Sequence, residues 1–154
     1  MSRPGGEEHT PAARILAFDY GLRRTGVAVG DTATGAGSPL VTLQARPDGP
    51  DWNAIEDLLR EWRPDLVLVG IPRMPDGGEG SFSPAARKFA TELRARFGVR
   101  VETADETLTS REARELLRDD RRSGRRMRRV RREDADALAA LLILRGWLQD
   151  HSGS

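Results

Sequence analysis

Several acidic residues lie at the ends of predicted strands or near the start of a predicted helix, where carboxylates can act as catalytic groups or metal ligands. Asp19 ends a short apolar run over residues 15–18, and Asp105 and Glu106 follow a later run of strand-like sequence. Asp136 falls in the first turn of a predicted final helix. A buried ionised carboxylate is costly to desolvate unless it is paired or bound to a metal. These positions are therefore candidates for a catalytic or metal-binding centre.

Convergent carboxylates without histidine or cysteine predict the ligands of a hard cation. All-oxygen coordination suits Mg²⁺ or Mn²⁺. Two such ions a few ångströms apart activate water and stabilise the leaving oxygen in phosphodiester cleavage. The chain has no cysteine, and its two histidines, His9 and His151, fall in predicted tails. Zinc chemistry and a histidine-based mechanism are therefore not expected.

Each carboxylate also has a purely structural interpretation. Asp19 can cap the turn that follows it by accepting bonds from nearby N–H groups, and this alternative stands beside the catalytic one. A carboxylate in the first turn of a helix is stabilised by the helix dipole. However, Glu133 and Asp134 already serve that end. Asp136 shares a face with the core residue Ala140, four positions later, and this placement favours a functional role.

Hydrophobic patterning predicts the elements that would position these groups. Predicted strands span residues 15–18, 27–29, 39–44, 65–71 and 99–103, and predicted helices span 51–62, 85–97, 109–118 and 133–149. The first three strands form an antiparallel meander, and each of the last two follows a helix. The prediction is an α/β fold with a mixed five-stranded sheet, three antiparallel strands and then two parallel ones, flanked by helices. If the first and fourth strands are neighbours, their carboxyl ends meet at one edge, where ligands bind in open α/β sheets.

Arginine dominates the basic residues. The net charge is only +1, and Lys88 is the single lysine. Eight arginines crowd one segment: Arg121, Arg122, Arg125, Arg126, Arg128, Arg129, Arg131 and Arg132. Blocks of like charge are often solvated loops. We favour instead an arm that binds phosphates and brings nucleic acid to the helix that carries Asp136, with strongly salt-dependent affinity. Arg23 and Arg24, in the predicted turn after Asp19, can touch the same backbone or simply form a surface turn.

The length of 154 residues suits one domain. We expect a flexible tail over residues 1–13, a single domain over 14–149 and a short tail over 150–154. No apolar run is long enough to cross a bilayer, and residues 1–13 lack the apolar core of a signal peptide. A membrane partner is therefore not expected. The sequence does not decide between a monomer and a homodimer.

The motifs, in order, resemble those of a known family. They are Phe18-Asp-Tyr-Gly21, Gly26-Val-Ala-Val-Gly-Asp31, Val69-Gly-Ile-Pro72, Asp76-Gly-Gly-Glu-Gly80, Asp105-Glu-Thr-Leu-Thr-Ser110 and the helix from Asp136 to Trp147. The sequence is similar over residues 15–148 to the YqgF (RuvX-like) family. These are bacterial proteins with an RNase H-like fold, described as nucleases of the 16S rRNA precursor or as Holliday junction resolvases. The chain departs from the usual pattern at Leu22, Met74 and Thr107.

The resemblance implies a two-metal nuclease site and a cytoplasmic bacterial protein. The family's acidic positions fall on Asp19, Glu106 and Asp136, with Asp105 as a weaker ligand candidate. The implied activity is a Mg²⁺- or Mn²⁺-dependent endonuclease that acts on structured nucleic acid, first of all the 5′ end of precursor 16S rRNA. A four-way DNA junction is the second candidate substrate, and paired cuts in it require a symmetric dimer.

Two other functions remain open at this stage. One is a non-catalytic rRNA-binding assembly factor that uses only the arginine-rich segment. The other is an ATPase of the actin and hexokinase type, whose phosphate-binding hairpin also opens with Asp-x-Gly. That class requires two such domains and a second phosphate motif, which a chain of this length lacks.

Overall fold

The computed structural model describes residues 13–71, 83–105 and 132–151. In chain order the elements are β1 (Arg14–Asp19), β2 (Arg24–Asp31), β3 (Gly37–Gln44), α2 (Trp52–Trp62), β4 (Leu66–Ile71), α3 (Ser83–Phe97), β5 (Val101–Asp105) and α5 (Arg132–His151). The sheet has five strands in the order β3-β2-β1-β4-β5. β2 pairs antiparallel with β1 and β3, whereas β4 pairs parallel with β1 and β5. The predicted mixed sheet is therefore confirmed, with the first and fourth strands as neighbours.

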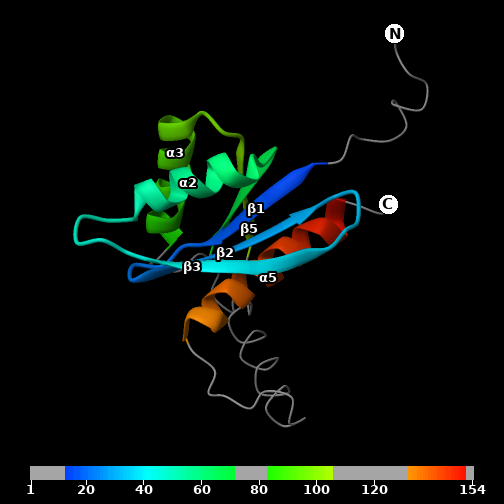
Figure 1. The fold of residues 1–154 in the computed structure, drawn as a ribbon, viewed down its shortest axis with the longest axis horizontal. Helices are drawn as coiled ribbons and strands as arrows, with labels where there is room; N and C mark the ends of the chain where they lie inside the picture. Colours follow the sequence, from blue (N-terminus) through cyan, green and yellow to red (C-terminus); the bar gives the residue numbers. More distant parts are fainter. Residues whose placement is uncertain (1–12, 72–82, 106–131, 152–154) are drawn as a thin grey trace.

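Helices cover both faces of the sheet (Figure 1). α2 and α3 lie on one face, and α5 crosses the other face as the last element of the chain. The core under α2 and α3 includes Leu16, Phe18 and Phe89, and the core under α5 includes Ile15 and Leu144; all five side chains are buried. β1 supplies alternate residues to the two cores because successive side chains of a strand point to opposite faces.

Local signals place the helix ends as the sequence predicts. The Asp51 carboxylate accepts a hydrogen bond from the backbone N–H of Ala54 at 3.1 Å and caps α2. Arg63 ends α2 in a left-handed conformation with φ of 46°. Gly98, with φ of 66°, ends α3 and donates its N–H to the carbonyl of Arg94 at 2.9 Å.

Several element boundaries differ from the prediction. β2 begins at Arg24, which we expected in the turn, because Arg24 is already in register with Gln44 of β3. β5 begins and ends two residues later than expected, since its pairing with β4 continues to Asp105. α5 extends past residue 149 to His151. The predicted helix over 109–118 and most of the loop over 72–84 lie outside the described residues. Within the described ranges, no helix is long and apolar enough to cross a membrane.

Candidate active site

The parallel strands bring the predicted acidic segments to one edge of the sheet. Phe18 of β1 is in register with Val69 of β4, and Ile71 of β4 is in register with Asp105 of β5. Asp19 and Asp105 therefore both lie at the carboxyl end of the sheet, with only β4 between their strands. Neighbouring strands lie about 5 Å apart, so the two backbones are separated by roughly 10 Å at this edge.

The side chain of Asp19 lies on the face of the sheet that α5 covers. Ile15 and Ala17, which precede it at intervals of two residues, both belong to the core under α5. Side chains two residues apart on a strand share a face. Asp19 therefore continues this row beyond the apolar core, at the end of the strand, where its side chain is partly exposed.

Gly26 allows the second turn of α5 to pack directly against the strand partner of Asp19. In the β1–β2 ladder, Asp19 is in register with Gly26. A Cβ atom at Gly26 would lie 1.9 Å from the carbonyl oxygen of Asp136 and 2.8 Å from the backbone nitrogen of Ala137. Both distances are shorter than real Cβ contacts, so only glycine permits this approach. The structure thus brings Asp19 and Asp136 together, although they are far apart in sequence.

Arg24 lies at the same place and contacts the second of these carboxylates. Its Nε donates a hydrogen bond to Oδ2 of Asp136 at 2.7 Å. The side chains are 23% and 27% exposed, respectively, so the pair is largely shielded from water. We considered Arg24 as a nucleic-acid contact in a turn. In the structure it is a strand residue whose guanidinium is bonded to Asp136.

The structure describes only some of the other predicted site residues. Arg23 is exposed in the turn between β1 and β2. Glu106 and the arginines from Arg121 to Arg131 lie outside the described residues, and for Asp105 and Arg132 only the backbone is described. The grouping of these residues with Asp19 and Asp136 therefore stays a prediction.

The donor set at the edge consists of carboxylates. Within the described ranges, no three Asp, Glu, His or Cys side chains are gathered in a way that could hold a metal ion. Asp19 and Asp136 together offer oxygen ligands of the kind that Mg²⁺ and Mn²⁺ accept. Two protein carboxylates fit a Mg²⁺ site, because this ion usually keeps several waters. The residues present therefore fit a hard divalent cation.

Tyr20 makes a contact beside the site that the sequence did not predict. It follows Asp19 directly, and its ring stacks on Phe89 of α3 with centroids 4.7 Å apart. Burial, and secondly the negative charge of Glu92, raise the pKa of the Tyr20 phenol above its usual value. Tyr20 thereby anchors the end of β1 to the helix layer opposite α5. The strand-end aromatic was visible in the sequence, but its partner was not.

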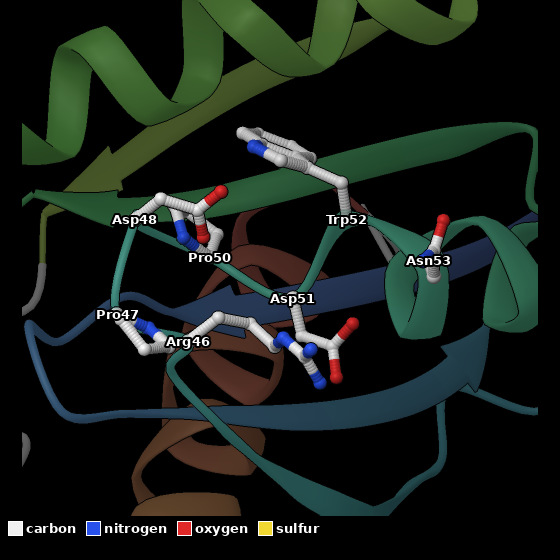
Figure 2. A pocket seen from close by; sticks show the side chains of 7 residues that line it. All are labelled: Arg46, Pro47, Asp48, Pro50, Asp51, Trp52 and Asn53. Carbon is white, nitrogen blue, oxygen red and sulfur yellow. The ribbon is translucent and has the colours of Figure 1, made fainter.

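A surface pocket adjoins the same edge on the side of α2. Its volume is about 440 Å³, and it is lined by Arg46, Pro47, Asp48, Pro50, Asp51, Trp52 and Asn53 (Figure 2). The segment is tied to the turn after Asp19, because the N–H of Ala45 donates to the carbonyl of Arg23 at 2.8 Å. The indole of Trp52 is occupied elsewhere, since it stacks on Phe89 with centroids 5.6 Å apart. The lining mixes both charges and indicates no single ligand.

Comparison with known proteins gives concordant results. The model of the RuvX family, described as Holliday junction resolvase, matches residues 13–150. A protein of Pseudomonas aeruginosa strain PAO1 is 45% identical over 142 residues, which are 92% of this chain and 95% of the relative. A protein of Azotobacter vinelandii is 46% identical over 137 residues, covering 88% and 93%. Both relatives bear the provisional name of pre-16S rRNA nuclease.

Solved structures of resolvases share the fold. RuvC of Thermus thermophilus, in complex with a Holliday junction substrate, has a TM-score of 0.52 and 18% identity, covering 89% of this chain and 94% of that one. The fowlpox virus resolvase, in complex with Holliday junction DNA, has a TM-score of 0.52 and 12% identity, covering 89% and 97%. The predicted RNase H-like fold is therefore confirmed.

Proposed function

The chain belongs to the RuvX Holliday junction resolvase family, and we propose that it is a metal-dependent endonuclease that cleaves structured nucleic acid. The contact between Gly26 and the backbone of Asp136 carries the proposal, because it brings the backbone of Asp136 against the strand partner of Asp19, at an edge where α/β sheets bind ligands. A cap alone would explain Asp19, but it would not explain why the N-terminal part of a helix from the far end of the chain packs against Gly26, the strand partner of Asp19.

Asp19, Asp136 and Glu106 are the proposed ligands of Mg²⁺ or Mn²⁺, with Asp105 as a weaker candidate. Bound divalent cations supply Lewis-acid activation of water and stabilisation of the leaving oxygen. The protein's own part is to hold the carboxylates on rigid elements: β1 holds Asp19, and the second turn of α5 holds Asp136, because α5 begins at Arg132, one residue before the predicted start. A strand and a helix keep such groups in position better than loops do.

Basic groups near the carboxylates would bind the substrate backbone. Arg23 and Arg46 are exposed in segments joined by the bond between Ala45 and Arg23. The arginine-rich segment over residues 121–132 leads directly into α5, and we assign it the main phosphate contacts. We expect recognition of shape and backbone, rather than base sequence, because no free aromatic platform is found among the described residues.

Precursor 16S rRNA is the substrate we propose, on the strength of the names of the two bacterial relatives. The specific observation that favours a four-way DNA junction instead is the family description, together with the fold shared with junction resolvases. Junction resolution requires two active sites related by symmetry, so it also requires a dimer.

One experiment compares the two substrates directly. Labelled 5′-extended 16S precursor RNA and a synthetic four-way junction are incubated side by side with Mg²⁺, Mn²⁺ or EDTA. The parent protein, Asp19→Asn and Asp136→Asn are tested, with Asp57→Asn on the opposite face as the matched control for loss of one negative charge. We expect RNA cleavage that requires metal and is lost only in the two site variants, which still bind RNA.

Other outcomes have equally definite meanings. Paired symmetric cuts in the junction alone would favour the resolvase. If Asp19→Asn cleaves as fast as the parent, the assignment of the site is wrong. If neither substrate is cut but both bind, the arginine-rich segment is the functional part, and the chain acts as a binding factor.

A further inference from the structure

Arg24 and Asp136 form an ion pair whose placement sets it apart from ordinary surface pairs. Exposed ion pairs contribute little to stability, because water and mobile side chains weaken them. Here the Nε–Oδ2 distance is 2.7 Å, about three quarters of each side chain is covered (23% and 27% exposed), and the partners are 112 residues apart. The pair therefore joins a strand of the sheet to the first turns of the last helix.

The geometry leaves part of the carboxylate available. The contact uses Oδ2 of Asp136 and the Nε of Arg24, so it occupies only one of the two carboxylate oxygens. Arg24 lies two residues before Gly26 on β2, and side chains two apart share a face. Two contacts thus fix the same turn of α5. The guanidinium of Arg24 holds the side chain of Asp136, and Gly26 packs against the backbone of Asp136.

We propose that Arg24 is a positioning residue that holds the Asp136 carboxylate in the orientation that accepts a divalent cation. The inference rests on the proposed function, since it concerns a ligand of that site. Carboxylate ligands of metals are commonly held by a hydrogen bond from a neighbouring group, and loss of that neighbour costs about 10- to 100-fold in metal affinity. Arg24 supplies this bond to Asp136 from a rigid strand.

The sign of the effect separates positioning from simple electrostatics. A positive charge near a cation site repels the cation, so a charge effect alone predicts tighter metal binding when Arg24 is removed. Positioning predicts the opposite, because the freed carboxylate samples orientations that do not bind. We expect Arg24→Gln to weaken Mn²⁺ binding about tenfold or more.

The test is isothermal titration of the EDTA-treated full-length protein with MnCl₂. Arg24→Gln is compared with Arg23→Gln, which removes the same charge from the adjacent exposed position, and with Arg24→Lys. We expect parental or slightly tighter binding for Arg23→Gln and partial recovery for Arg24→Lys, whose ammonium is a point charge that fixes a carboxylate plane less well. Tighter binding by Arg24→Gln would overturn the proposal.

A double-mutant cycle excludes a merely structural role. If Arg24 acts through Asp136, then Arg24→Gln has no further effect on the residual affinity of Asp136→Asn. A further loss in that background would show that Arg24 acts on the fold in general and would overturn the proposal. If Arg24→Gln does not fold, Arg24→Lys decides: we expect weaker binding than in the parent, because a point charge fixes the carboxylate less well, and parental affinity would refute the inference.

Failure of this inference is distinguishable from failure of the proposed function. If Asp136→Asn and Asp19→Asn bind Mn²⁺ like the parent, the site itself is wrong and the role of Arg24 falls with it. If those variants lose binding while Arg24→Gln retains parental affinity, the site stands and only the positioning role is refuted.

Discussion

Replacing Gly26 with alanine perturbs the contact on which the proposed site depends. The new Cβ would lie 1.9 Å from the carbonyl oxygen of Asp136, whereas ordinary contact begins at 3.4 Å. The difference, 3.4 minus 1.9, means that the backbone of α5 at Asp136 must retreat by about 1.5 Å. The atoms that the new Cβ would meet belong to the backbone of α5, so rotation of a side chain cannot relieve the clash.

The retreat should impair catalysis more than folding. A misplacement of about 1 Å in a catalytic group costs on the order of 100-fold in rate, so we expect at least that loss of cleavage. Overpacking typically costs about 1–3 kcal/mol of stability, which a protein of this size tolerates. The assays are the rate of cleavage of the labelled substrate and urea unfolding followed by circular dichroism.

Gly146→Ala is the matched control. Gly146 lies within α5, and a Cβ there would meet nothing within 4 Å. Alanine in a helix interior is favoured over glycine by about 1 kcal/mol, so this variant should be slightly more stable and should cleave like the parent. If Gly26→Ala also cleaves and unfolds like the parent, the argument that this glycine places α5 beside Asp19 is refuted.

Further predictions concern stability and substrate affinity. Asp51→Ala should lower the free energy of unfolding by about 1 kcal/mol in urea, because it removes the cap of α2, and a comparable loss in the exposed control Asp48→Ala would contradict this. The pKa of Asp31 is below its usual 3.8, mainly because its carboxylate accepts a hydrogen bond from the backbone N–H of Thr34. The ionised Asp31 carboxylate therefore stabilises the fold above about pH 4, and this stabilisation is lost as the pH falls through the folded-state pKa. Urea titrations from pH 7 to pH 3 should therefore show a stability advantage of the parent over Asp31→Asn that shrinks in acid, and a constant difference would be evidence against this contribution. RNA binding should weaken steeply with added salt, and a flat dependence in a filter-binding assay would contradict binding through phosphate contacts.

Much of the fold was predictable because the hydrophobic patterns of the strands and helices agreed with the residues that begin and end those elements. The predicted strand over 65–71 agrees with β4, and the predicted helix ends at residues 51 and 97 agree with the Asp51 cap and the Gly98 stop. β2 and β5 were misplaced at their ends because pairing with a neighbouring strand, rather than composition, decides where a strand begins. Arg24 and Asp105 are polar residues that pair with a neighbouring strand. A search for runs of hydrophobic residues therefore leaves them out of the predicted strands.

The candidate site was predictable in part. Asp19 was identified as a candidate because it ends a predicted strand, and Asp136 because it lies near the start of the last predicted helix. The resemblance to a known family then implied that both are ligands of the same metal site. The contacts that join them were not predictable from one sequence. Nothing in the sequence around Gly26 indicates its contact with α5, and nothing near Arg24 indicates a partner 112 residues away. Long-range packing of α5 on β2 creates both contacts.

The measurement that tests the central claim most directly is the position of manganese in crystals of the protein soaked in MnCl₂. Anomalous diffraction locates the metal independently of any substrate or assay. We predict an anomalous peak between the carboxylates of Asp19 and Asp136 in the parent protein, and no peak there in Asp136→Asn. Manganese bound elsewhere, or a peak at this position that persists in Asp136→Asn, would contradict the account.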